Sequence, residues 1–309
     1  MSNADGQPTA STVTEPGAND TPIARHIAST IARREALATL TLPLPQTTRI
    51  FTISNQKGGV GKTTSSVNLA AALARSGARV LVVDLDPQGN ASTALGVDHH
   101  EDVMSSYDVL VEGEPLSAVI QHSPEHELLD CVPATLHLAG AEIDLAARDN
   151  ARNILRDALD AHLKSMPEPY HYVFIDCPPS LGLLTVNAFV AAREVLIPIQ
   201  CEYYALEGLS QLLKNIERIR VSLNPSLVVS TMLLTMYDPR TNLSQQVADD
   251  VREHFPTVVL DAVIPRSVRI SEAPGFSQSV LEYDFDSSGS LAYREAAAEI
   301  ALRGAAGKA

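Results

Sequence analysis

The sequence contains no tryptophan, and aromatic residues make up only 5% of its 309 positions. Its three cysteines, Cys131, Cys177 and Cys201, form no C-x-x-C pair, which argues against a disulfide framework and against a zinc site. No stretch approaches the roughly 20 consecutive apolar residues that span a bilayer, and no segment near the start resembles a signal peptide. We therefore expect a cytoplasmic protein.

Positive charge is also scarce. The 23 Lys and Arg against 37 Asp and Glu give a formal net charge of −14, which excludes a protein whose whole surface attracts nucleic acid. The imbalance is local, because residues 98–194 hold 17 acids and 5 bases, whereas residues 213–309 hold 12 acids and 10 bases. A basic face is therefore still expected in the C-terminal third.

The composition divides the chain into a tail and a domain. Residues 1–22 are rich in Ser, Thr, Pro, Gly, Asn and Asp, and we expect them to be disordered because they offer almost nothing to bury. Residues 23–39 repeat isoleucine and leucine at helical spacing, which predicts an amphipathic helix; it either docks on a surface or simply lies exposed. We expect a tail over 1–48 and one folded domain over 49–309.

That domain alternates buried-strand patterns with amphipathic helix patterns. Continuous Val, Ile and Leu runs lie at 49–54, 78–85, 171–177, 194–200 and 227–236, and helices fit at about 63–76, 150–165, 183–192, 205–221, 243–254 and 290–303. Such an alternation predicts a doubly wound, mostly parallel α/β sheet with helices on both faces. Ligands of such sheets bind outside the carboxyl ends of the strands.

The segment after the first predicted strand, "SNQKGGVGKTTSS" at 54–66, nearly matches the phosphate-binding pattern G-x-x-x-x-G-K-[ST]. The expected first glycine is replaced by Gln56, and a second lysine, Lys57, follows it. The glycines that remain allow the backbone to curl so that successive N–H groups face phosphate oxygens. Lys62 is predicted to lie along the β and γ phosphates and the Thr63 hydroxyl to bind Mg²⁺.

Carboxylates follow two other predicted strands. Asp176 ends the run "VFID", which suits an acid that holds Mg²⁺ through water, and "VVDLDPQGN" offers Asp84 at the strand end and Asp86 in the turn beyond it. A carboxylate in this turn can face the γ-phosphate and orient an attacking water. Either cluster alone is also compatible with a turn or helix-capping role.

Six separated blocks are then found in order: "NQKGGVGKTT", "VDLDPQGNAS", "IDCPPSLG", "QCEYYALEGL", "TMYDPRTNLSQQV" and "IPRSVRISEAPGF". With these blocks, residues 49–303 strongly resemble the ParA/Soj chromosome and plasmid partition ATPases. The resemblance implies a P-loop ATPase of the deviant Walker A subclass, with ATP and Mg²⁺ as cofactors, that forms a homodimer around two ATP molecules.

The resemblance also implies roles for individual residues. Lys57 crosses to the partner's nucleotide while Lys62 serves its own, Asp86 positions the hydrolytic water, and Asp176 holds Mg²⁺ through water together with Thr63. The implied catalytic set is Lys57, Lys62 and Asp86. The implied phosphate-binding residues are Lys57, Gly58, Gly59, Val60, Gly61, Lys62, Thr63 and Thr64, and the loop of Pro265, Arg266 and Ser267 passes near the adenine.

Members of this family hold non-specific double-stranded DNA when ATP is bound, and a ParB-like partner stimulates their slow hydrolysis. The residues that match the family's DNA-contacting arginines are Arg240 and Arg269, and Arg266 and Arg218 are further candidates. The resemblance thus implies a nucleoid-associated partition ATPase. An operator-binding helix-turn-helix extension is not expected, because the residues before 49 are too few.

Relatives with the same loop perform other work. A MinD-like ATPase at a membrane surface is the main alternative, although the ending "AYREAAAEIALRGAAGKA" lacks a large apolar stripe, and no stable membrane association is expected. Iron–sulfur relatives need closely spaced cluster cysteines, which the sequence does not supply. ATP-dependent metabolic synthases require a substrate pocket that no motif here indicates.

Overall fold

The computed structural model describes residues 21–148, 150–203 and 205–307. The chain divides into two compact units, residues 1–40 and 41–309. The described part of the first unit contains helix α1 (Pro22–Thr39), which begins where Thr21 Oγ1 accepts a hydrogen bond from the Ala24 N–H at 3.1 Å. Disorder was expected over residues 1–22; residues 1–20 lie outside the described residues, whereas Thr21 caps α1 and Pro22 is its first residue, so the expectation is wrong for these two. The helix predicted over 23–39 is confirmed as α1, and the domain boundary at 48 stays a prediction.

The second unit is built on one sheet, which has eight strands in the described residues, in the order β3-β4-β2-β5-β1-β6-β7-β8. Neighbouring strands in this order are parallel, except that β3 and β4 are antiparallel. The strands are β1 (Arg49–Ile53), β2 (Val80–Asp84), β3 (Gln121–His122), β4 (Leu129–Val132), β5 (Tyr172–Asp176), β6 (Glu194–Gln200), β7 (Val228–Tyr237) and β8 (Val259–Pro265).

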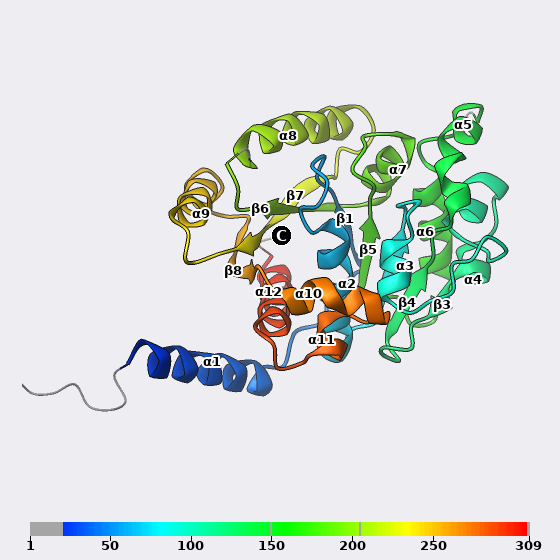
Figure 1. Ribbon diagram of the computed structural model, residues 1–309. Helices are drawn as coiled ribbons and strands as arrows, with labels where there is room; N and C mark the ends of the chain where they lie inside the picture. The colour runs from blue at the N-terminus through cyan, green and yellow to red at the C-terminus, as the bar shows by residue number, and fades with distance from the viewer. Residues whose placement is uncertain (1–20, 149, 204, 308–309) are drawn as a thin grey trace, which may run out of the picture. The chain divides into compact units, whose positions relative to one another are not determined.

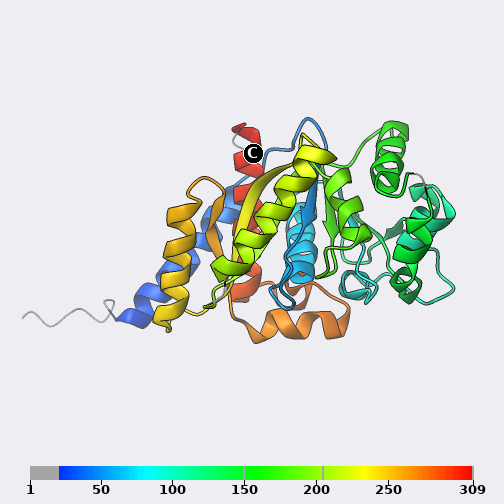
Figure 2. The same cartoon turned by 90° about the horizontal axis from the view of Figure 1, so that it is seen from above.

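Helices cover both faces of this sheet (Figures 1 and 2). The α-helices are α2 (Lys62–Arg75), α3 (Asn90–Ala94), α4 (Leu116–Val119), α5 (Ala141–Ala146), α6 (Ile154–Ser165), α7 (Leu183–Ala191), α8 (Ala205–Ser222), α9 (Asn242–His254), α10 (Val268–Glu272), α11 (Val280–Tyr283) and α12 (Ser288–Ala305). Short helical turns form η1 (Asp108–Glu112), η2 (Leu136–Ala139) and η3 (Ala273–Phe276). The predicted doubly wound, mostly parallel architecture is confirmed.

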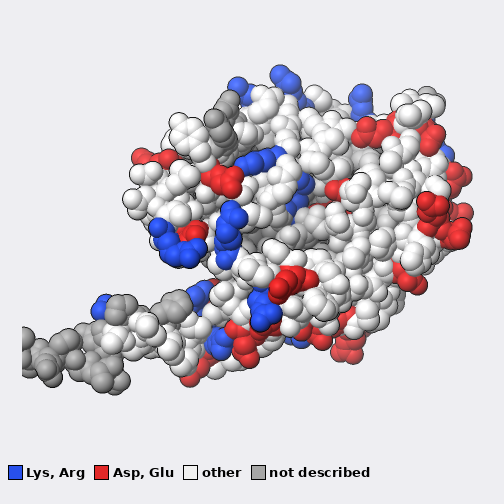
Figure 3. Space-filling view, in the orientation of Figure 1, with Lys and Arg blue, Asp and Glu red and all other residues white. Residues whose placement is uncertain are grey.

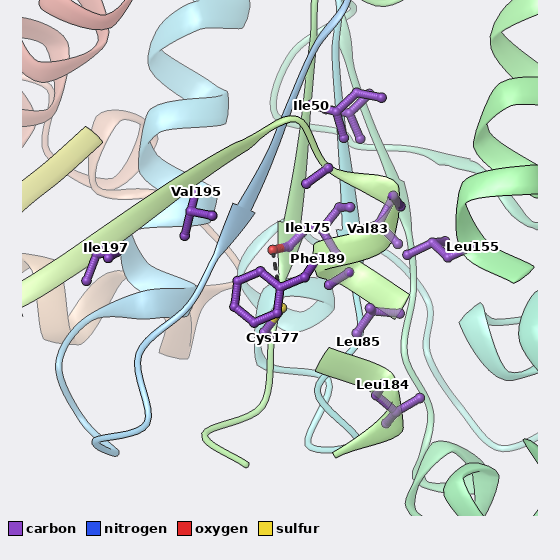
Figure 4. Close-up of a cluster of buried hydrophobic side chains, with 14 of the residues drawn as sticks. Ile50, Val83, Leu85, Leu155, Ile175, Cys177, Leu184, Phe189, Val195 and Ile197 are labelled. Carbon is purple, nitrogen blue, oxygen red and sulfur yellow. Dashed lines mark hydrogen bonds between the residues drawn. The ribbon is translucent and has the colours of Figure 1, made fainter. Parts of the chain in front are cut away.

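Two hydrophobic cores lie on opposite faces of the sheet, because successive strand residues point to alternate sides. In β5, Val173 and Ile175 join the core under α6, α7 and α8, and Tyr172 and Phe174 join the core under α2 and α12. Figure 4 shows the first core, with Phe189 of α7 packed beside Cys177 at the end of β5. A strand buried on both sides is apolar at most of its positions, which explains the nearly continuous apolar runs in the sequence; Arg49 and Thr52 of β1 are buried polar exceptions.

All the predicted strands and long helices form. The described sheet also contains strands that were not predicted, and one helix begins later than predicted. Strands β3, β4 and β8 were not expected, since β3 and β4 are short and β8 is interrupted by the exposed Asp261 and ends in Pro265. Helix α6 begins at Ile154 rather than near 150, because the preceding residues form a turn in which the Asn153 amide donates to Asn150 Oδ1 at 2.8 Å.

Three strands carry the candidate site. In the sheet, β5 lies between β2 and β1, so their carboxyl ends share one edge. There β2 ends at Asp84, β5 ends at Asp176 in direct register with Asp84, and β1 leads into the glycine-rich loop. The fold therefore brings the loop and both aspartate clusters together, as ligand sites at such sheet edges require.

Candidate active site

The loop between β1 and α2 depends on two left-handed glycines. Gly59 has φ 71° and Gly61, the residue before α2, has φ 89°. Residues that have a Cβ rarely adopt this left-handed backbone conformation. Between them Val60 is buried, and its carbonyl accepts a hydrogen bond from Thr235 Oγ1 of β7 at 2.9 Å. The loop is thus curled by its glycines and fixed from outside by a neighbouring strand.

Lys62 begins helix α2 and is almost fully buried, with 7% of its surface exposed. Its Nζ donates to the Lys57 carbonyl oxygen at 3.2 Å, which closes the loop on itself. Burial lowers the pKa of Lys62, and the nearby Asp176 and Asp86 carboxylates oppose this effect. Lys62 therefore belongs to the same charge cluster as both aspartates.

Asp176 is completely buried and accepts hydrogen bonds from two hydroxyl groups of α2. Thr63 Oγ1 donates to Oδ2 at 2.7 Å, and Ser66 Oγ donates to Oδ1 at 2.8 Å. Burial, together with the negative charge of Asp84, raises the pKa of Asp176 to about 7. A cation bound beside Asp176 would favour the ionised form of this carboxyl group.

The two acids of the β2 turn have different surroundings. Asp84 is completely buried and accepts from the Ser92 N–H, the Ser92 hydroxyl and the Asp86 N–H at 2.8–3.0 Å, and burial raises its pKa to about 6. Asp86 is partly exposed, and its Oδ1 accepts from the Gln88 N–H at 3.0 Å. Asp84 therefore organises the turn, whereas Asp86 presents a carboxylate to the site.

The donor groups suit Mg²⁺. Thr63 and Asp176 offer a hydroxyl and a carboxylate oxygen from one place, and Mg²⁺ binds such hard oxygens, usually one or two carboxylates plus phosphates and waters. Burial, with the negative charge of Asp84 adding to it, raises the pKa of Asp176, and a cation beside this carboxylate would oppose both effects. Thr63 and Asp176 are thus the residues that would hold a metal here.

Lys57 points away from the loop that contains it. Its N–H donates to Asn55 Oδ1 at 3.0 Å, while its Nζ lies 3.0 Å from Glu202 Oε2, beyond the end of β6. Arg266 lies on the other side of the same carboxylate, with its Nη2 3.6 Å from Glu202 Oε1. The loop of Pro265, Arg266 and Ser267 is thereby placed beside the phosphate loop.

The candidate DNA-contacting arginines lie on exposed elements. Arg240 follows β7 and makes a bidentate pair with Asp238, with N–O distances of 2.9 and 2.7 Å. This pair lowers the pKa of Asp238 to about 2. Arg269, in α10, lies 3.3 Å from both Glu272 and Asp284. Both arginines therefore already have carboxylate partners within their own chain, and Arg218 is exposed on α8.

Sequence reasoning missed four residues that shape this site. Three are buried or part-buried hydrogen-bonding groups and one is an acid: Ser66, Ser92, Thr235 and Glu202. Ser66 lies one helical turn after Lys62, so its position on α2 could have suggested contact with the same ligands. The other three come from distant segments, and nothing local indicates their contacts.

Comparison with known proteins agrees with this geometry. A family model described as an AAA domain matches residues 48–229. The chain is 52% identical over 257 residues to the chromosome partitioning protein ParA of Caulobacter vibrioides, covering 82% of this chain and 94% of that protein. It is 47% identical over 256 residues to the chromosome-partitioning ATPase Soj of Thermus thermophilus, covering 82% and 96%.

Among solved structures, cobyrinic acid a,c-diamide synthase from Mycobacterium smegmatis, with bound ATP analogue and magnesium, is similar with a TM-score of 0.71. Its sequence is 38% identical, and the match covers 83% of this chain and 95% of that one. A strand, a glycine-rich loop with its lysine and hydroxyl, and acids on the neighbouring strands define the P-loop ATPase fold. Within that class, the chain belongs to the ParA/Soj family of chromosome-partitioning proteins.

In the part of the chain that the structure describes, none of the helices combines the length and apolar character that a bilayer crossing requires.

Proposed function

We propose that the protein is a DNA-partition ATPase that hydrolyses ATP to ADP and phosphate. The observation that carries this proposal is the loop with two lysines of opposite orientation: Lys62 turns into the loop and Lys57 turns out of it. One lysine inside the site and one outside it is the arrangement expected of a nucleotide site that a second chain completes. The names of the relatives support the same function.

Each side chain has a place in this reaction. The loop N–H groups of residues 58–64 bind phosphate, and the buried Lys62 ammonium lies where charge on the phosphates would be stabilised. Thr63 and Asp176 would hold Mg²⁺, which neutralises phosphate charge when bound. Asp86, partly exposed in its turn, is proposed to orient the attacking water.

We propose that ATP drives formation of a homodimer in which Lys57 reaches the partner's nucleotide, and that the dimer binds non-specific nucleoid DNA through Arg240 and Arg269. Two copies double the number of phosphate contacts, so weak non-specific affinity of roughly 10⁻⁴ to 10⁻⁶ M becomes dependent on ATP. A ParB-like partner that stimulates slow hydrolysis would then release the DNA.

The alternatives fit the structure less well. A MinD-like membrane role needs a free amphipathic C-terminal helix, yet α12 is packed into the core, with Leu291, Tyr293 and Ile300 at most 2% exposed. An iron–sulfur role needs accessible thiols, yet Cys131, Cys177 and Cys201 are all buried. A synthase role is suggested by the name of one solved relative at 38% identity, but the relatives from Caulobacter vibrioides and Thermus thermophilus, at 52% and 47% identity, are named as chromosome-partitioning proteins.

The deciding experiment measures retention on bulk DNA with ATP, with ADP and without nucleotide, and repeats all three conditions with liposomes. DNA retention that requires ATP is the expected result. Retention on liposomes instead would favour the MinD-like alternative, and no ATP effect on either surface would remove the proposed switch.

The matched variant is Lys57→Ala, which keeps Lys62 and the loop glycines in place. We expect it to bind one ATP per chain but to lose ATP-dependent dimerisation in light scattering. A dimer that persists in this variant would show that Lys57 does not act across the interface.

A further inference from the structure

Glu202 lies at the centre of a small cluster of charges beside the phosphate loop. It follows β6 and precedes α8, and its two carboxylate oxygens face different cations: Oε2 is 3.0 Å from Lys57 Nζ, and Oε1 is 3.6 Å from Arg266 Nη2. Oε1 also accepts from the side-chain amide of Gln200 at 2.5 Å. In Figure 3, basic side chains gather around the hollow near the middle of the face, with acidic ones among them.

The backbone fixes where the Lys57 side chain starts. The Lys57 N–H is held by Asn55 Oδ1, and the Lys57 carbonyl is held by Lys62 Nζ at 3.2 Å. Asn55 is itself anchored, because its amide donates to the Pro198 carbonyl of β6 at 2.8 Å. The anchor through Asn55 does not involve the phosphate site, so the Lys57 backbone N–H stays in place while the Lys57 side chain rotates from one anion to another.

We infer that Glu202 is a positioning residue that holds Lys57 within its own chain while the protein is monomeric, and gives it up when a second chain brings a nucleotide phosphate. The inference rests on the proposed ATP-dependent dimer. Because an ammonium group exchanges one anion for another, Lys57 is never left without a counter-ion. The pairing with Glu202 thus opposes dimerisation until nucleotide is present on both chains.

Arg266 shares the same carboxylate, so release of Lys57 changes the surroundings of a second element. Arg266 begins the turn between β8 and α10, and its N–H donates to the Tyr237 carbonyl of β7 at 3.0 Å. Loss of Lys57 from the cluster leaves Glu202 to Arg266 and Gln200. The contact therefore links the state of the phosphate loop to the loop proposed to border the adenine.

The expected size of the effect follows from exposure. Lys57 and Glu202 side chains are each 43% exposed, and exposed pairs of this kind change an equilibrium roughly 1.4- to 5-fold. Dimerisation breaks one pair in each chain, so the factor is squared. Glu202→Gln, which keeps an oxygen for Gln200 but removes the charge, should tighten the dimer formed with a non-hydrolysable ATP analogue and Mg²⁺ roughly 2- to 30-fold.

The test is sedimentation equilibrium of the full chain with that analogue at low and high salt. The gain from Glu202→Gln should shrink as salt rises, because screening already weakens the pair in the wild type. Glu202→Asp, which keeps the charge, should resemble the wild type, and Glu217→Gln, which breaks the exposed Arg220 pair on α8, should have no effect. A dimer of Glu202→Gln that is no tighter than the wild type at low salt would overturn the inference.

A second measurement tests the contact without a dimer. Trace acetylation of the nucleotide-free protein, read by mass spectrometry, should modify Lys57 several-fold faster in Glu202→Gln, with the exposed Lys164 and Lys214 as internal references. An unchanged rate at Lys57 would contradict the pairing. Failure of the wild type to dimerise with the analogue, combined with faster Lys57 acetylation in the variant, would reject the proposed function while keeping the cis contact.

Discussion

Replacement of Asp176 by Asn should make the nucleotide-free protein more stable and, at the same time, weaken its binding of a nucleotide with Mg²⁺. Among the described residues, the donors to the two carboxylate oxygens of Asp176 are hydroxyl groups, those of Thr63 and Ser66. A hydroxyl can rotate and accept instead of donate, and Ser66 Oγ already has the Lys62 carbonyl as a second acceptor at 3.1 Å. An asparagine amide therefore finds partners at both positions.

The charge that is removed was unfavourable. Because burial raises the pKa of Asp176 from 3.8 to about 7, the folded protein binds this proton more tightly than the unfolded chain does. The stability that this group contributes is fully present below pH 3.8 and is lost as the pH rises through about 7. At about 1.4 kcal/mol per pKa unit, the loss is at most about 4 kcal/mol.

We therefore expect Asp176→Asn to unfold at a higher temperature than the wild type at pH 8, by about 1 to 3 kcal/mol in free energy. The difference should be smaller at pH 5 and should shrink further as the pH falls toward 3.8. Addition of Mg²⁺ and an ATP analogue should reverse the order. Saturation at 100 times the Kd stabilises the wild type by about 2.7 kcal/mol, whereas the variant, which lacks the acid for the metal, should gain much less.

Asp84→Asn is the matched control, because Asp84 is the register partner of Asp176 and equally buried. Both of its oxygens accept from backbone N–H groups, of Asp86 and Ser92, and a backbone donor cannot reverse. An amide NH₂ at either position faces an N–H, which costs about 1 to 3 kcal/mol and offsets the gain from removing a carboxylate whose pKa burial raises to about 6. This variant should therefore be less stable than Asp176→Asn at pH 8. Thermal unfolding at both pH values decides. The reasoning is refuted if Asp176→Asn is less stable than the wild type at pH 8, or if Asp176→Asn and Asp84→Asn have the same stability.

Three further substitutions test other parts of the site. Asp86→Ala should bind ATP and DNA but release phosphate at least about 100-fold more slowly, and rapid turnover would exclude a role in positioning water. Arg269→Glu should leave the ATP dimer intact yet weaken retention on non-specific DNA at low salt; unchanged retention would remove it from the DNA face. Thr235→Val should weaken nucleotide binding about 2- to 10-fold because the Val60 carbonyl loses its donor, while Thr235→Ser restores it; equal affinities in a titration would contradict this role.

The parts of the fold that could be predicted from the sequence are those set by local pattern. Strands β1, β2 and β5 are buried at every position, so each leaves a mainly apolar run in the sequence, and the glycine-rich loop has a fixed spacing to its lysine. Edge elements leave no such pattern. Strand β8 has an exposed Asp261 and pairs on one side with β7 in an irregular register, which explains why its existence was not predicted.

The difference between the two acids of the β2 turn shows where sequence reasoning ends. Asp84 and Asp86 are two residues apart, and both follow a strand of apolar residues, so the pattern treats them alike. The structure separates them through Ser92, eight residues further on, whose N–H and hydroxyl both donate to Asp84. Burial of one acid and exposure of the other depend on how α3 packs against the end of β2, which is a tertiary contact.

The cations of the proposed DNA and nucleotide faces show the same limit in electrostatics. From the sequence, Lys57 and Arg269 are positive charges available for phosphate; in the folded chain each has a carboxylate partner, Glu202 for Lys57 and Asp284 for Arg269. A phosphate that binds either cation must replace an anion already present, so its net gain is the difference between two ion pairs rather than the whole of one. Such an exchange makes single contacts weak and several simultaneous contacts decisive. A protein whose cations are paired in this way should hold DNA only when a dimer presents the DNA-contacting arginines of both chains at the same time.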